Sequence, residues 1–162
     1  MIPLLAGIYL SLGTNRRSMH ASQVTHDLAS MYAQGVDFSQ AANQSIARRL
    51  LDPQDGKAVL ILTRLRLVTP TDCGPSAQCA NNGLPVIVQR IVIGDPDLRP
   101  STLGSPLSID RRTGNVLNWA MDASARVSDA TVTLKAGESG YAAEAFIAGP
   151  DDQGGVYART LF

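Results

Sequence analysis

The chain has little of what enzyme active sites, metal centres and nucleic-acid interfaces require. Its 162 residues include only two histidines and two cysteines, and 14 basic residues balance 14 acidic ones. The arginines are scattered rather than clustered, which argues against nucleic-acid binding. Aromatic residues make up 5% of the chain, so the core must consist mainly of Leu, Ile, Val and Ala. A hydrophobic content of 44% still favours a folded chain, of a length that suits one domain with an appendage.

Motifs for cofactor and catalytic chemistry are also missing from the sequence. It contains no phosphate-binding loop, no Gly-x-Ser-x-Gly, no Rossmann fingerprint and no Cys–His pairing. His20 and His26 are six residues apart, which on a helix separates them by about 240° instead of placing them on one face as a metal pair requires. The acidic stretches 95–97 and 151–152 lack the ligand count of a calcium loop and indicate turns. We therefore expect no metal, no cofactor and no enzymatic activity.

The two cysteines, Cys73 and Cys79, are separated by five residues that include Gly and Pro. Such a loop can turn the chain back on itself, so a disulfide is feasible, and closing it would contribute about 2 kcal/mol in the chain-entropy model. Two free thiols, or half of a zinc site that needs two further ligands, are the alternatives. A disulfide would favour an oxidising, extracytoplasmic compartment.

The N-terminal stretch Ile2–Gly13 is apolar, and no charged residue appears before Arg16. It is too short to span a bilayer, which requires about 20 apolar residues. It also lacks the basic region and the cleavage site of a secretory signal. It could be the end of a longer membrane helix, a helix buried between subunits, or an ordinary core helix. We expect it to pack against a membrane or against other copies of the chain, through Ile2, Leu4, Leu5, Ile8, Tyr9 and Leu12.

From Thr14 onward the spacing of apolar residues predicts an amphipathic helix. Its apolar stripe consists of Ala21, Val24, Leu28, Met31 and Tyr32. Gly35 interrupts the pattern, and Asp37 followed three residues later by Gln40 predicts the N-cap of a second helix. The second helix has apolar or long side chains at helical spacing, namely Ala42, Ile46, Arg49 and Leu50. Turn residues at 52–56 end it.

Beyond residue 56 the pattern changes to that of β-strands. Residues 57–69 alternate in their second half, and residues 84–93 form an apolar run that predicts a second, central strand. The segment 94–126 is rich in turn residues and predicts a surface excursion with a small hairpin around 111–115. A short strand is expected at 131–134.

The end of the chain predicts a β-hairpin between residues 141–148 and 155–162. If the hairpin is symmetric about Asp151 and Asp152, Phe146 faces Tyr157, and Glu144 faces Arg159. We expect Glu144 and Arg159 to form a structural ion pair.

The predicted fold class is α+β. A long N-terminal helix, broken near Gly35–Ser39, is followed by a mainly antiparallel β-sheet head, in a pilin-like layout. Two domains are expected: a helical arm at 1–52, which serves as membrane or filament-core segment and shaft, and a β-rich globular head at 53–162.

Four short segments resemble the TadE-like family, subunits of the tight-adherence branch of type IV pili. Residues 3–9 are similar to the later part of that family's membrane helix, and residues 23–27 and 35–39 are similar to the shaft. Residues 137–146 are similar to a late strand in which a small turn precedes Tyr, two apolar residues, Glu and an aromatic. The basic leader, peptidase site and early glutamate of such pilins are not present before Ile2. We expect that they were either removed by processing or lie upstream of Met1.

The resemblance implies a structural subunit that is anchored in the inner membrane before assembly and then joins a surface filament that mediates adhesion. Its partners would be other pilin subunits, with no nucleic acid, and a surface receptor is conceivable but not identified. The alternative is a secreted or periplasmic binding or adhesion module, in which the loop 94–126 binds a ligand. A hydrolase of unrecognised type is a third possibility, for which no nucleophile–base pair is found.

Overall fold

The computed structural model describes residues 2–51, 57–74, 79–149 and 154–162, with side chains from residue 16 onward. Two helices come first, α1 (Ile2–Ala33) and α2 (Ala41–Leu51). Four strands follow: β1 (Ala58–Leu67), β2 (Pro85–Gly94), β3 (Ser139–Ala148) and β4 (Gly155–Leu161). Short 3₁₀ helices lie at Pro70–Cys73 and Ala123–Ala125.

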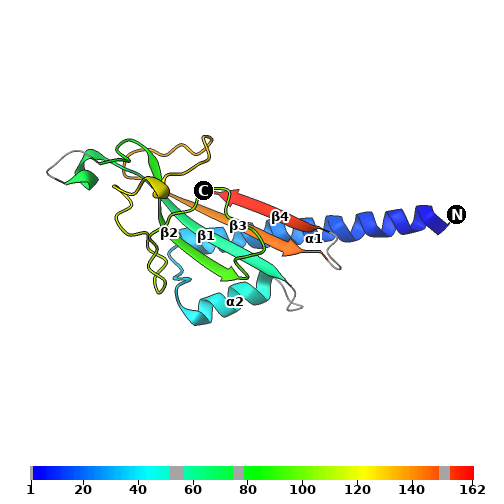
Figure 1. Cartoon of the computed structure of the whole chain (residues 1–162). Helices are drawn as coiled ribbons and strands as arrows, with labels where there is room; N and C mark the ends of the chain where they lie inside the picture. Colours follow the sequence, from blue (N-terminus) through cyan, green and yellow to red (C-terminus); the bar gives the residue numbers. More distant parts are fainter. Residues whose placement is uncertain (1, 52–56, 75–78, 150–153) are drawn as a thin grey trace.

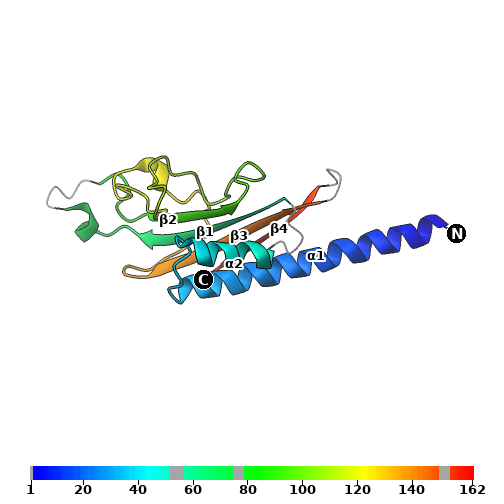
Figure 2. The same ribbon diagram turned by 90° about the horizontal axis from the view of Figure 1, so that it is seen from below.

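The predicted apolar stripe of the first helix is confirmed. Ala21, Val24, Leu28 and Tyr32 are buried, because this part of α1 packs on β3 and β4. Leu28 is fully buried in a core that includes Leu60 of β1. Residues 16–20 of α1, by contrast, are all exposed. The N-terminal part of the α1 ribbon continues past the end of the sheet (Figure 2).

The second helix begins later than predicted and turns a different face inward. Asp37 accepts hydrogen bonds from the backbone and side chain of Ser39, at 2.9 and 2.6 Å, and so caps a turn that precedes α2. The buried residues of α2 are Ala47 and Leu51, whereas Ile46 and Leu50 are 52% and 44% exposed. The predicted stripe was therefore displaced by one residue on the helix surface.

The four strands form one antiparallel sheet in the order β2-β1-β3-β4. The prediction that the second strand is central is wrong, since β1 occupies the interior and β2 lies at one edge. The outer edge of β2 is covered by the excursion, where Arg90 N donates to Gly114 O at 2.7 Å and Val116 N donates to Val88 O at 2.9 Å. Gly114 has a φ of 72°, and a Cβ there would lie 2.5 Å from Arg90 O, so this close approach requires glycine.

The segment between β2 and β3 is more than a surface excursion, because it forms the layer on the sheet face opposite the helices. Leu103 and Ala125 are fully buried and pack with Leu65 and Val86 of the strands in a second core. The predicted small hairpin is present as a bridge between Ile109 and Val116. The strand expected at 131–134 is not formed; this stretch consists of turns and irregular backbone.

The final hairpin has the predicted register. In the register of β3 and β4, Glu144 lies opposite Arg159, and Phe146 lies opposite Tyr157. The turn at 150–153, with the expected centre of symmetry at Asp151 and Asp152, lies outside the described residues.

The antiparallel sheet is confirmed, but the predicted fold class, a pilin-like arm followed by a separate head, is wrong. The helical stretches with described side chains, 16–33 and 41–51, both lie on one face of the sheet (Figure 1). They share a core with the strands, so helices and sheet form one folded unit instead of an arm and a head. The apolar stripe of α1, which the sequence places in a shaft, is a core layer of this unit. The predicted domain boundary near residue 52 falls outside the described residues.

Candidate functional site

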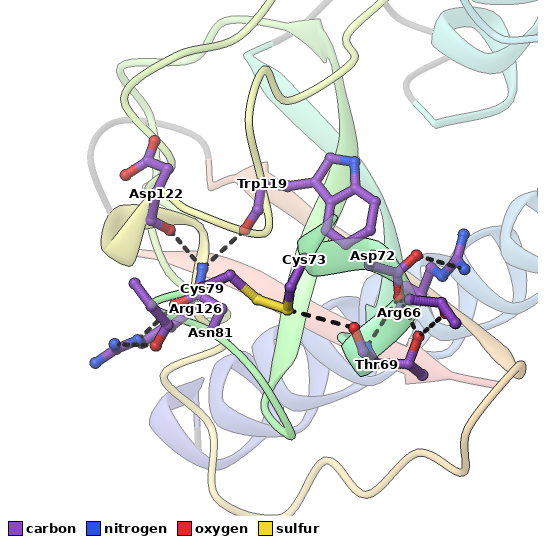
Figure 3. Close-up of a disulfide and its surroundings, with 11 residues drawn as sticks. Arg66, Thr69, Asp72, Cys73, Cys79, Asn81, Trp119, Asp122 and Arg126 are labelled. Carbon is purple, nitrogen blue, oxygen red and sulfur yellow. Dashed lines mark hydrogen bonds and ion pairs between the residues drawn. A yellow bond between two sulfur atoms is a disulfide. The ribbon is translucent and has the colours of Figure 1, made fainter. Parts of the chain in front are cut away.

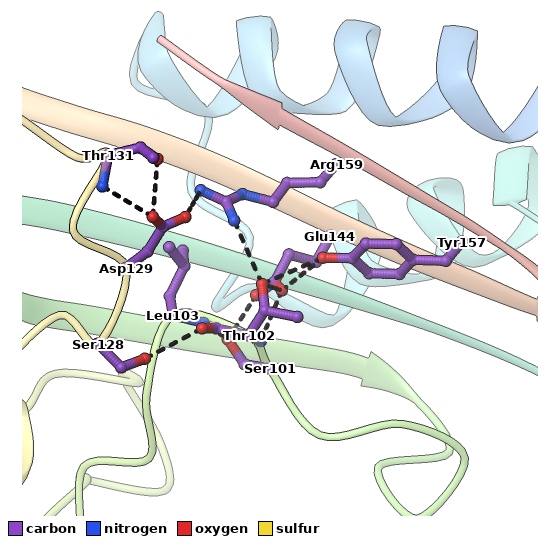
Figure 4. Close-up of polar contacts among 9 residues, drawn as sticks. All are labelled: Ser101, Thr102, Leu103, Ser128, Asp129, Thr131, Glu144, Tyr157 and Arg159. Carbon is purple, nitrogen blue, oxygen red and sulfur yellow. Dashed lines mark hydrogen bonds and ion pairs between the residues drawn. The ribbon is translucent and has the colours of Figure 1, made fainter.

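A buried polar cluster surrounds the carboxylate of Glu144 in the middle of β3 (Figure 4). Glu144 is 2% exposed. One carboxylate oxygen accepts from the backbone N of Thr102 at 2.8 Å, the Oγ1 of Thr102 at 2.7 Å and the hydroxyl of Tyr157 at 2.8 Å. The other oxygen accepts from the hydroxyl of Ser101. The carboxylate thus attaches the loop at 101–102 to the sheet.

Arg90 on β2 joins the same cluster through Ser101. Its guanidinium donates to Ser101 Oγ at 3.0 Å, to the carbonyl oxygen of Gly104, and more weakly to Thr63 Oγ1 at 3.4 Å. Ser101 Oγ also accepts from the backbone N of Leu103 at 3.1 Å. The hydroxyl of Ser101 therefore accepts two hydrogen bonds and donates its proton to Glu144, which links β2 and β3 across the central strand.

Both charged groups of this cluster remain charged at neutral pH. Burial raises the pKa of Glu144, but hydrogen bonds from Ser101, Thr102 and Tyr157 outweigh it, so the pKa lies below its ordinary value. Burial lowers the pKa of Arg90 to about 10, against the opposing effect of Glu144. The four hydrogen bonds that the carboxylate accepts all come from within the protein, three of them to one oxygen. This arrangement fixes the loop at 101–102 to the sheet through a buried, ionised carboxylate.

The predicted ion pair between Glu144 and Arg159 is not formed, although the two residues are cross-strand neighbours. Arg159 instead pairs with Asp129 from the loop layer. Hydrogen bonds from the side chain and backbone of Thr131, followed by those of Arg159, lower the pKa of Asp129 to about 2. The strand register places Arg159 beside Glu144. The carboxylate of Glu144, however, accepts its hydrogen bonds from the loop at 101–102, and Asp129 of a second loop forms the ion pair with Arg159.

A second structured region contains the disulfide (Figure 3). Cys73 and Cys79 are joined as predicted, with 5.3 Å between their Cα atoms, so the free-thiol and zinc alternatives do not apply. Cys73 ends a 3₁₀ helix in which Asp72 accepts hydrogen bonds from Thr69, and Asp72 also pairs with Arg66 of β1 at 2.9 Å. The disulfide and this ion pair hold the segment after β1 against the sheet.

The loop that carries Trp119 is attached to the same region by Asn81, which the sequence analysis did not single out. Asn81 is fully buried, and its amide donates to the carbonyl oxygens of Trp119 and Asp122, each at 2.7 Å. Its side-chain oxygen accepts from Arg126 at 2.7 Å (Figure 3). A single asparagine after a cysteine gives no sequence signal for such a role.

The structure describes only the backbone of the residues that are expected to contact a membrane or other subunits. The side chains of Ile2, Leu4, Leu5, Ile8, Tyr9 and Leu12 lie outside the described residues, although their backbone belongs to α1. Among the described residues, no helix combines the length and the apolar character needed to cross a membrane. Among the same described residues, no group of three His, Cys, Asp or Glu side chains could hold a metal ion.

The two histidines occupy unrelated positions on α1. His20 Nε2 lies 3.1 Å from the carbonyl oxygen of Leu50, and so connects α1 to α2. The ring of His26 lies 5.1 Å from that of Phe162, near the C-terminal end of the sheet. Each has a local structural partner.

No family model, curated protein or solved structure matches the chain. The resemblance to the TadE-like family therefore stays a hypothesis that depends on the four short segments.

Proposed function

We propose that the chain is a structural subunit of an extracytoplasmic filament of the tight-adherence kind, which assembles through the N-terminal segment of α1. The partners are other subunits of the filament, with a membrane as the environment of this segment before assembly. We propose a structural role and no enzymatic one. The disulfide between Cys73 and Cys79 supports an oxidising location.

The observation that carries the proposal is the position at which α1 leaves the sheet. Ala21 is the first described residue of the helix that is buried, and residues 16–20 are all exposed. The ribbon before residue 16 extends beyond the strands (Figures 1 and 2), and the sequence of residues 2–13 contains no charged residue. An apolar helical segment outside the folded body is stable in water only when another surface covers it.

The size of the segment is sufficient to drive association. Burying about 300–600 Å² of apolar surface at about 25 cal/mol per Å² gives on the order of 10 kcal/mol per subunit before the cost of association. That gain would be repeated at each contact of a filament.

The experiment compares the full chain with a variant that carries Leu5→Glu and Ile8→Glu. Wild-type protein is expected to sediment as large assemblies and to form filaments in electron micrographs, whereas the variant should sediment near the chain mass of 17.2 kDa with an unchanged unfolding temperature. The control is Leu107→Glu, at a leucine of the loop layer that is 86% exposed, which should leave assembly intact. Assembly of the double variant at the wild-type protein concentration would refute the proposal.

The alternative, a secreted or periplasmic binding module, predicts a different outcome in the same experiment. In that case the wild-type protein itself sediments as a monomer, and the N-terminal segment is covered by its own fold.

A further inference from the structure

A separate feature of the molecule is an open pocket between β1 and the loop that carries Trp119. Its volume is about 390 Å³ and its wall includes Arg64, Arg66, Trp119, Asn115 and Ser139, with valines completing it. Arg64 and Arg66 are two positions apart on one strand, and Ser139 lies opposite Arg66 in the sheet register. A pocket of this volume falls within the range of small-molecule sites.

The charge of this pocket is positive and only partly compensated. No acidic residue lines it. Arg66 pairs with Asp72 at 2.9 Å, and its guanidinium lies 5.5 Å from the centre of the Trp119 ring. Arg64 takes part in none of the ion pairs formed by the described residues. Its cross-strand neighbours are Gln89 and Tyr141, and neither is an aspartate or a glutamate. Among the described residues, the positive charge of Arg64 therefore has no counterion.

The neutral groups of the wall can hydrogen-bond to a ligand. Gln89, the neighbour of Arg64 on β2, is not available to a ligand. Its side-chain nitrogen donates to Thr113 O at 2.8 Å, and its side-chain oxygen accepts from the hydroxyl of Tyr32 at 2.8 Å. The amide of Asn115 and the hydroxyl of Ser139 do not have such fixed side-chain partners among the described residues. They supply donors and acceptors next to Arg64, as a hydroxylated ligand needs.

We infer that this pocket binds a small, singly charged carboxylate that carries hydroxyl groups, such as a uronic acid. The carboxylate forms charge-assisted hydrogen bonds with the guanidinium of Arg64, whose planar fork fits two carboxylate oxygens. Asn115 and Ser139 bind hydroxyl groups. A single uncompensated charge favours a carboxylate over a phosphate dianion. The site does not depend on the proposed assembly, because none of the residues that line the pocket belongs to the N-terminal segment.

Trp119 provides a specific readout, because it is the only tryptophan of the chain. The full chain is titrated at low ionic strength with sodium glucuronate, and in parallel arms with glucose and with inorganic phosphate. Saturable change of the tryptophan fluorescence is expected with glucuronate, with affinity at least about tenfold higher than for glucose, which lacks the charge. The affinity should fall as salt screens the partly exposed arginine.

Variants distinguish binding in this pocket from nonspecific attraction of glucuronate to exposed arginines. Arg64→Gln should weaken glucuronate at least about tenfold, while Arg64→Lys retains part of the affinity, because it keeps the charge and loses the fork. Ser139→Ala, at the exposed first residue of β3, should weaken binding by a smaller factor. Arg111→Gln, at an exposed arginine outside the pocket, is the matched control and should leave binding unchanged.

Three results would overturn the inference. The first is the absence of saturable binding of glucuronate to wild-type protein. The second is equal affinity of wild-type protein and the Arg64→Gln variant, with both folded by circular dichroism. The third is phosphate affinity that equals or exceeds that for glucuronate, which would contradict the assignment of a carboxylate.

Discussion

Replacing Glu144 with glutamine tests whether the buried cluster stabilises the fold as its geometry indicates. Glutamine has the shape of glutamate, and its oxygen can still accept from Thr102 and Tyr157. Its amide nitrogen would then face the hydroxyl of Ser101. That hydroxyl already accepts from Arg90 and from Leu103 N, so its proton must remain directed at residue 144. Two donors would meet at a buried position, and the charge that balances Arg90 would be lost.

The magnitude follows from the contacts that change. A hydrogen bond to a charged group contributes about 1.5–3 kcal/mol, and a buried donor left without an acceptor costs about 1–3 kcal/mol. Because the site can relax, we expect the Glu144→Gln variant to lose about 3 kcal/mol of unfolding free energy in total. For a chain of this size that corresponds to a fall of about 6–12 °C in the unfolding temperature.

The effect should depend on pH in a defined direction. The pKa of Glu144 is lowered in the folded state from its ordinary value of 4.5. Its contribution is therefore fully present above pH 4.5 and is lost as the pH falls through the lower folded-state pKa. The difference in stability between wild type and variant should shrink below pH 4.5, because a protonated glutamate and a glutamine are similar.

Urea unfolding of both proteins at a series of pH values between 7 and 3 measures this difference. Glu138→Gln is the control, since Glu138 is 55% exposed and lies 3.9 Å from Lys135, and it should change stability by less than about 0.5 kcal/mol. A Glu144→Gln protein as stable as wild type at pH 7, or a difference that stays constant down to pH 3, would refute the reasoning.

Two further predictions concern the disulfide and the helix–sheet core. Replacing Cys73 and Cys79 by serine should lower the unfolding free energy by about 2 kcal/mol, and a reducing agent should destabilise wild-type protein but not the variant in urea unfolding. Equal stability of reduced and oxidised wild type would contradict this. Leu28→Ala, at a fully buried position between α1 and the sheet, should cost about 2–5 kcal/mol, whereas Met19→Ala, at a residue 74% exposed, should have little effect. Similar thermal unfolding of the two alanine variants would show that this part of α1 does not pack as described.

Features that depend on the spacing of apolar residues were predictable from the sequence. The stripe from Ala21 to Tyr32 has helical periodicity, and the β3–β4 hairpin follows from two strand-like runs around a turn. The face of α2 was not predictable in the same way, because Ile46 and Leu50 are as apolar as Leu51. Only contact with Phe38 and the strands decides which of them is buried.

The polar cluster could not be predicted, because its partners are brought together by irregular backbone. Glu144 contacts Ser101 and Thr102, more than 40 positions earlier in the sequence. The strand register places Arg159 beside Glu144, but which acid it pairs with depends on where the loops after β2 and before β3 cross the sheet. No sequence motif predicts where these loops cross the sheet. The same holds for Asn81, whose partners lie 38 and 41 residues away.

The coverage of the sheet bears on where the N-terminal segment of α1 can lie. One face of the sheet is occupied by residues 21–33 and by α2, and the other by the loop layer that contains Leu103 and Ala125. The edge of β2 is closed by hydrogen bonds to Gly114 and Val116. For residues 2–13 to pack on either face of the sheet or on the edge of β2, one of these layers would have to be displaced, at the expense of side chains that are now fully buried. Cover from another molecule requires no such displacement, which is why the double variant at Leu5 and Ile8 should lose assembly without losing stability.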